Sequence, residues 1–236
     1  MLASPRYRGF GALLLMMLIA PQLRATMPTT TEAAEQSMRQ FLAQGDSQRP
    51  YRATRRLEAR NGDAVGWLEA VTEYSPAAGF RYTITSEGGS GNIRDKVLKA
   101  ILEGEREAIA RGEMSRSALA LCNYEFQVHG VDENGLAKVL LSPKRKEHVL
   151  ISGAMFLRPV DGELVRVQGR LAKSPSFWIK TVDIVRSYER IEGAVMPVAL
   201  ETTAQVRMFG AATLRMTYDY TEIDGHPVAP RTMARR

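Results

Sequence analysis

Apolar and polar residues alternate along much of this sequence, and this period of two constrains the fold more than any other feature. The alternation is clearest near the C-terminus, where Leu214, Met216, Tyr218 and Tyr220 are interleaved with Thr213, Arg215, Thr217 and Asp219. A strand with this pattern buries one face and exposes the other to water, which is typical of antiparallel sheets. The sequence therefore predicts a mainly β protein.

Similar runs recur between turn signals such as Asn61-Gly62 and Asp161-Gly162. We expect strands over residues 51–59, 64–74, 80–85, 122–129, 136–141, 148–158, 164–171, 177–189, 198–208 and 213–223. An open twisted sheet of roughly ten strands rarely stays flat, so it curls or closes. This strand number favours a barrel or half-barrel.

Two segments have helical periodicity instead. Residues 32–44 follow a suitable N-cap, Thr31, and residues 93–111 are amphipathic, with Asn92 and Asp95 predicted to form a capping box. Two helices are too few to provide βαβ crossovers for so many strands. We therefore expect an α+β fold in which a curved antiparallel sheet, an incomplete β-barrel, is covered on its concave face by about two helices.

The first 25 residues predict export. Arg6 and Arg8 precede an apolar run over residues 10–20, and the small residue Ala25 follows in a polar exit. The apolar run is shorter than the roughly 20 residues that a membrane-spanning helix needs. We expect a signal peptide over residues 1–25, cleaved near Ala25, and a single periplasmic domain over residues 26–236. An uncleaved N-terminal anchor is the alternative.

The net charge of +6 is a poor argument for nucleic-acid binding. Arg6, Arg8 and Arg24 contribute three of the positive charges, and the first 25 residues contain no acid. The densest basic run, residues 144–146, predicts a solvated hairpin loop, with a docking site for anionic headgroups as the alternative. We expect no nucleic-acid partner.

The single cysteine, Cys122, excludes an internal disulfide. It has the same strand phase as Tyr124 and Phe126, which predicts a buried, unreactive thiol. No recognisable motif places a histidine beside it, so a catalytic thiol is the weaker hypothesis. The core has to stabilise the fold without a covalent cross-link.

No pattern in the sequence indicates catalysis or metal binding. His129, His148 and His226 lack a second ligand at metal-binding spacing. The glycine-rich run at residues 88–91 lacks the Lys and Ser/Thr of a phosphate loop, so it predicts a flexible connector that interrupts the sheet before the second helix. We expect no catalytic residue, no metal and no cofactor; a hydrolase with an unrecognised site is the second alternative function.

Part of the sequence is similar to a known group of exported proteins. The matching features are the stretch LVRVQGRLAKSPSFW from Leu164 to Trp178, then Tyr188, Gly193 and Pro197, and the run from Met216 to Tyr220. These features resemble uncharacterised exported bacterial proteins of the LolA/LolB-like lipoprotein-sorting superfamily, over roughly residues 66–225. The resemblance implies a curved antiparallel sheet whose helix-covered apolar cavity takes up acyl chains.

The resulting hypothesis is a periplasmic carrier that binds a lipid or lipoprotein without covalent chemistry. We expect the cavity to be lined by Val198, Leu200, Val206, Met208, Leu214, Met216, Tyr218 and Trp178. Trp178 follows a Ser-Pro-Ser turn, so it lies near a rim, either packed on a helix or as an access point for an apolar ligand or partner. The alternative function is an envelope sensor or protein-interaction module on the same fold. The expected partners are an acylated ligand, envelope proteins and at most a peripheral membrane contact.

Overall fold

The computed structural model describes residues 30–45, 48–208 and 210–229. Helix α1 (Thr30–Gln44) is followed by strands β1 (Tyr51–Asn61), β2 (Ala64–Ser75) and β3 (Gly79–Gly89). A second helical segment comprises α2 (Gly91–Ile93), the π-helical turn η1 (Arg94–Leu98), α3 (Lys99–Ala110) and the 3-10 turn η2 (Glu113–Arg116). The remaining strands are β4 (Tyr124–Val131), β5 (Ala137–Pro143), β6 (Ile151–Leu157), β7 (Leu164–Leu171), β8 (Ile179–Ile191), β9 (Ala194–Val206), β10 (Gly210–Ile223) and the short β11 (His226–Pro227).

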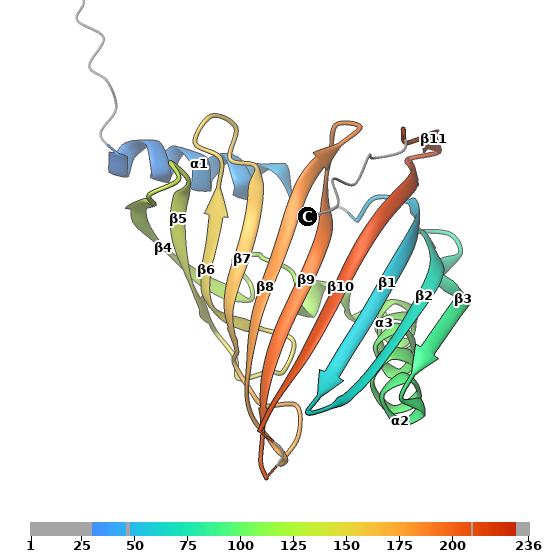
Figure 1. Ribbon diagram of the computed structural model, residues 1–236. Helices are drawn as coiled ribbons and strands as arrows, with labels where there is room; N and C mark the ends of the chain where they lie inside the picture. Colours follow the sequence, from blue (N-terminus) through green and yellow to red (C-terminus); the bar gives the residue numbers. More distant parts are fainter. Residues whose placement is uncertain (1–29, 46–47, 209, 230–236) are drawn as a thin grey trace, which may run out of the picture.

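The described strands form one antiparallel sheet in the order β3-β2-β1-β10-β9-β8-β7-β6-β5-β4, with β11 paired to β10. The sheet is not closed, because β3 and β4 are its two edges. Figure 1 shows the strands fanning out from a narrow end toward α1, with α1 and α3 behind the sheet. The predicted mainly β, incomplete-barrel fold with two covering helices is therefore confirmed. The single-domain organisation stays a prediction, and the expected signal peptide lies outside the described residues.

The helices cover one face of the sheet, which we call the inner face. Residues directly opposite each other on neighbouring strands share a face. Leu57 on β1 lies opposite Met216 on β10 and Leu68 on β2, and all three are buried. This first core cluster includes Leu98 and Leu102 from the second helical segment. The predicted alternation of β10 thus has the correct phase.

A second core cluster lies on the same face at the other half of the sheet. There α1 packs on β4, β5 and β6 through Ala34, with Met38 and Phe41 at the cluster's edge. The cluster includes the buried side chains of Val139 and Met155. The two helices therefore cover the two flanks of the inner face separately.

Three local predictions around the second helical segment are wrong. Its N-cap is Ser90, which makes no side-chain cap bond, and Asp95 forms an ion pair with Lys99 at 2.8 Å instead of a capping box. Gly88 and Gly89 continue β3 rather than interrupting the sheet. A Cβ atom on Gly89 would lie 2.2 Å from the Val65 carbonyl oxygen, so close strand packing, not flexibility, explains this glycine.

The predicted burial of Cys122 is also wrong, because the thiol-bearing side chain is exposed. Strand β4 begins only at Tyr124, which is buried, and Phe126 follows in the same phase. Cys122 lies in the preceding turn and is exposed there. The phase of the strand was predicted correctly, but its start was not.

The basic run at residues 144–146 lies in the β5–β6 loop, as predicted, and two of its cations hold the segment that leads into β4. Lys144 Nζ donates a hydrogen bond to the Leu121 carbonyl oxygen at 2.8 Å, and Arg145 Nη1 donates to Asn123 Oδ1 at 2.8 Å. These contacts favour a structural role for the loop over a headgroup site. Among the described residues, no helix is both long and apolar enough to cross a membrane.

Candidate functional site

The centre of the inner face, between the two helix-covered flanks, carries an exposed arginine. Arg186 on β8 lies opposite Leu200 on β9 and Val167 on β7, so its side chain projects from the inner face. Val167 is buried, whereas Arg186 is exposed. The principal helix contacts are those of α1 with β4–β6 and of α3 with β3. Arg186 is therefore exposed on the inner face at β8, away from these principal helix contacts.

The surroundings of Arg186 are mainly apolar or phenolic. Tyr188 follows it on the same strand, and the partly buried Leu200 and Tyr218 pack against the first core cluster. Among the described residues, the structure gives Arg186 no ion pair with a carboxylate. We call Arg186, Tyr188, Leu200 and Tyr218 the central site.

One edge of the central site is fixed by a buried ion pair that joins the sheet to α3. Arg55 on β1 is 2 % exposed, and its Nη1 donates to Glu105 Oε2 at 2.6 Å while Nη2 donates to Glu105 Oε1 at 3.0 Å. Nη2 also donates to the Tyr51 hydroxyl. The guanidinium lies over the rings of Phe80 and Tyr218, at 5.0 and 4.6 Å from their centroids. This arrangement anchors α3 over the first core cluster.

The protonation states around the central site follow from burial and from these neighbours. Tyr188, more than any other group, raises the pKa of Arg186, with a smaller contribution from Tyr218. Burial alone would lower the pKa of Arg55, but Tyr218 and Glu105 raise it above its ordinary value. Burial raises the pKa of the Tyr218 phenol. At neutral pH Arg55 and Arg186 are therefore cations, and the Tyr218 phenol between them is neutral.

The sequence-predicted cavity residues divide between two places in the structure. Val198, Leu200, Leu214 and Tyr218 are partly buried on the inner face beside the first core cluster, and Met216 is inside that cluster at 4 % exposure. Val206 is half-buried at the end of β9. The structure thus brings the β9–β10 set together, and its ligand-binding role stays a prediction.

Met208 and Trp178 are separated from this set, at the narrow end of the sheet. Strand β9 ends at Val206, and Met208 adopts a positive φ of 71° in the following turn, where it is 88 % exposed. Trp178 immediately precedes β8 and is 57 % exposed. Both side chains are exposed in irregular segments beyond the ends of their strands, and neither belongs to the first core cluster.

Sequence reasoning missed Arg55, Glu105 and Arg186. Each arginine occupies an apolar phase of its strand, Arg55 between Ala53 and Leu57 and Arg186 between Ile184 and Tyr188. An arginine at a strand position where its neighbours are buried needs an acidic partner or serves a function. The sequence could therefore have indicated both arginines. Glu105 carries no comparable signal on its helix.

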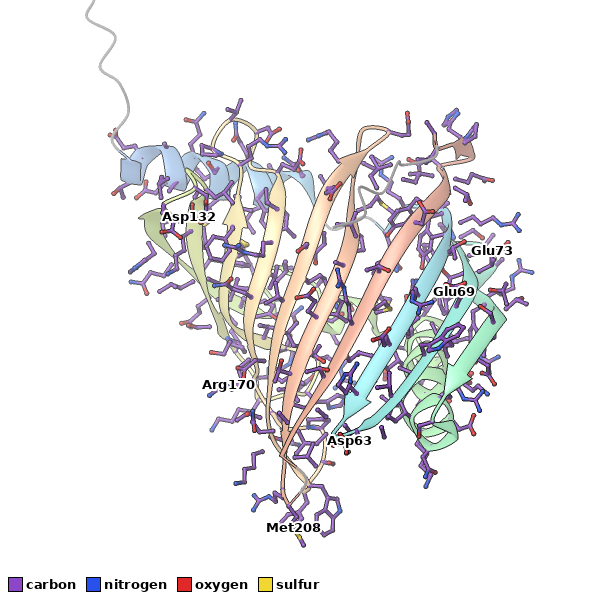
Figure 2. The ribbon with its side chains drawn as sticks, viewed as in Figure 1. Asp63, Glu69, Glu73, Asp132, Arg170 and Met208 are labelled. Carbon is purple, nitrogen blue, oxygen red and sulfur yellow. The ribbon has the colours of Figure 1, made fainter. Side chains whose placement is uncertain are left out.

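The outer face of the sheet bears a groove of about 950 Å³ across β5–β9. Its lining is mixed, with Lys138, Gln168, Arg170, Glu201 and the apolar Val185 among the residues. Figure 2 looks onto this face and labels Arg170. Arg170 Nε donates to Asp183 Oδ1 at 3.0 Å across the β7–β8 pair, so part of the lining charge is internally compensated.

The described residues contain no group of three or more His, Cys, Asp and Glu side chains that could hold a metal ion. His129, His148 and His226 are all exposed and lie on different elements. The central site presents a cation, phenols and apolar surface, which are groups suited to molecular recognition.

Comparisons with known proteins identify no relative by sequence. No protein-family model matches the chain, and no curated protein matches it. Among solved structures, the chain is similar to a DUF1329 family protein from Desulfovibrio piger (7% identity, TM-score 0.39, 81% of this chain and 92% of that chain). It is also similar to a LolA superfamily protein from Nitrosomonas europaea (9% identity, TM-score 0.41, 83% and 94% of the two chains).

A third similar structure is the MucA/MucB complex of Pseudomonas aeruginosa, with 10% identity, a TM-score of 0.23 and coverage of 84% and 99%. The LolA superfamily is also the group to which the sequence resemblance points.

Proposed function

We propose that the protein is a non-covalent carrier or binding protein for an amphiphile with an acyl chain and an acidic headgroup. The observation that carries this proposal is the exposed Arg186 beside the apolar Leu200 on the inner face, with no carboxylate in an ion pair with it among the described residues. A small number of well-placed polar groups in an apolar site is typical of ligand binding. The partly buried Leu200 and Val198 would contact the acyl chain, and Arg186 would pair with the acidic group.

The experiment is the uptake of a fluorescent fatty acid and of the matching fatty alcohol by the purified protein. We expect uptake of the acid, and we expect Arg186→Gln to weaken binding of the acid about tenfold while leaving the alcohol unchanged. Leu200→Ser should weaken both ligands. Arg215→Gln is the matched control, because Arg215 lies on the outer face at 69 % side-chain exposure. Failure of the unaltered protein to take up either ligand would overturn the proposal.

We further propose that the protein acts in the periplasm after removal of residues 1–25. The basic, apolar and polar order of these residues supports this localisation. Mass spectrometry of the protein from its native envelope should give an N-terminus near Thr26, and an intact Met1 would contradict cleavage. Denaturing extraction of the same material should release an acylated ligand.

An interaction module for envelope proteins is the second candidate, and the outer-face groove is the observation that favours it. A peptide segment could lie along the groove between Lys138 and Glu201. Crosslinking from an introduced cysteine at Gln168, in a Cys122→Ser background, would test this surface. Crosslinks to a protein partner, with no fatty-acid uptake, would favour the module over the carrier.

A further inference from the structure

The narrow end of the sheet presents exposed apolar side chains from two segments. This end comprises the β7–β8 loop (residues 172–178) and the β9–β10 turn (residues 207–208). Met208 is 88 % exposed, Phe177 is 73 % exposed and Trp178 is 57 % exposed. Figure 2 shows Met208 at the extreme tip. Since Arg207 N donates to the Trp178 carbonyl oxygen at 2.7 Å, the two segments form one surface.

Local contacts hold the aromatic rings in an outward arrangement. The rings of Phe177 and Trp178 pack edge to face with their centroids 5.5 Å apart. The Arg207 guanidinium lies 4.8 Å from the centroid of the Phe177 ring. Ser174 Oγ donates to the Lys180 carbonyl oxygen at 2.7 Å and so closes the loop. The rings are therefore positioned by their own loop and by Arg207.

Uncompensated positive charge surrounds these apolar groups. Lys173, Lys180 and Arg207 are exposed, and within the described part of the chain none of them forms an ion pair. The sequence has no Asp or Glu over residues 164–182 or 202–218. Asp63, from the adjacent β1–β2 turn, is set back from the tip occupied by Met208 (Figure 2). The tip is thus both apolar and cationic.

We propose that the narrow end docks on a bilayer surface that contains anionic phospholipids. Phe177, Trp178 and Met208 insert among the headgroups, while Lys173, Lys180 and Arg207 face the phosphates. Aromatic rings, Trp above all, favour the membrane–water interface, and basic residues add attraction to anionic lipid. A protruding tip with unpaired cations fits a bilayer surface better than it fits a protein groove. The six residues of this surface are distinct from those of the central site.

The test is flotation of the purified protein with vesicles of phosphatidylcholine alone and of equal parts phosphatidylcholine and phosphatidylglycerol. We expect binding to the anionic vesicles that decreases as salt is added. The double variant Phe177→Ser/Trp178→Ser should lose at least about tenfold in binding. Val160→Ser is the matched control, because Val160 is 82 % exposed in the β6–β7 loop, at the opposite strand ends. The unaltered protein and all variants are prepared with the same N- and C-termini, so that differences in binding come from the substitutions alone.

Charge substitutions test the second half of the proposal. Lys173→Gln and Lys180→Gln should each reduce binding to the anionic vesicles about fivefold. Lys96→Gln, an exposed lysine on η1, should leave binding unchanged. In a Trp67→Phe background, the emission of Trp178 should shift to shorter wavelength when anionic vesicles are added.

Equal binding to both vesicle types, no binding, or full binding by Phe177→Ser/Trp178→Ser would each overturn the docking proposal. Fatty-acid uptake separates it from the carrier function. The tip variants should retain uptake, and Arg186→Gln should retain vesicle binding. Tip-dependent vesicle binding without any fatty-acid uptake would overturn the carrier and leave the docking surface in place.

Discussion

Arg55 of β1 and Glu105 of α3 form a two-pronged ion pair, with N–O distances of 2.6 and 3.0 Å, that joins the sheet to its covering helix. The arginine is almost fully buried, whereas the carboxylate retains 25 % exposure. A buried cation depends strongly on its partner, because the cost of removing it from water persists when the partner is lost. This pair is therefore the most sensitive polar contact of α3.

Glu105→Gln should destabilise the protein by about 2–3 kcal/mol, since it leaves the Arg55 charge buried without its carboxylate. The value is at the low end for such a change because Glu105 is partly solvated. Urea denaturation measures the effect. Glu107→Gln on the same helix, with 53 % side-chain exposure, should stay within about ±0.5 kcal/mol. Equal losses in the two variants would show that Arg55 does not need its partner.

Met216→Ala should cost about 2–5 kcal/mol, because Met216 is 4 % exposed inside the first core cluster. Thr217→Ala, on the opposite face of the same strand, should change the free energy of unfolding by no more than about 0.5 kcal/mol. Thermal unfolding and fatty-acid uptake, measured together, distinguish a residue of the packed core from a residue that lines a ligand cavity. A small loss of stability combined with altered uptake would place Met216 beside a ligand cavity instead.

Cys122 should react with a thiol reagent in the native protein nearly as fast as in urea-unfolded protein, because its turn is exposed. The rate of thiolate release from an aromatic disulfide reagent measures this directly. Strong protection in the native state would mean that the segment before β4 is covered in solution. The Cys122→Ser variant provides the blank.

Stability should fall as the pH rises above about 10, the ordinary pKa of tyrosine. Burial raises the pKa of the Tyr51, Tyr124 and Tyr220 phenols. Above pH 10 the unfolded chain therefore releases protons that the folded chain keeps, so alkali favours unfolding; below pH 10 this stabilisation is fully present. Urea midpoints and tyrosinate absorbance, followed from neutral pH upward, test the prediction. Ionisation of Tyr51, Tyr124 and Tyr220 near pH 10 with an unchanged native circular dichroism spectrum would contradict it.

The sequence predicted the sheet and the inward orientation of Leu200, Leu214 and Met216. In a strand with one buried face, apolar residues recur at every second position, so the sequence shows which side chains are buried. The ends of the strands were less predictable. Periodicity alone does not distinguish Cys122, in a turn, from Tyr124, in a strand. Arg207 and Met208 continue the polar–apolar alternation of β9, yet the structure places them in the turn at the narrow end of the sheet.

The central site was hidden for a different reason. Arg55 and Glu105 are 50 positions apart, and only the packing of α3 on the sheet brings them together. Arg186 could have been noticed as a cation in the phase of Ile184 and Tyr188. Whether such a cation faces a partner or solvent depends on how far each helix extends over the sheet, which no local pattern encodes.

The last long strand, β10, lies in the middle of the sheet, between β1 and β9. Thr221 in β10 donates a hydrogen bond to the carbonyl oxygen of Arg52, 169 positions earlier in the chain. Without residues 210–223, β1–β3 and β4–β9 can form at most two separate half-sheets, in which the edges of β1 and β9 that face β10 are unpaired. Unpaired edges promote aggregation, and pairing across so long a separation is slow. A chain truncated before β10 would hold two half-sheets with unpaired edges instead of one continuous sheet, so the full sheet forms only once residues 210–223 have been made.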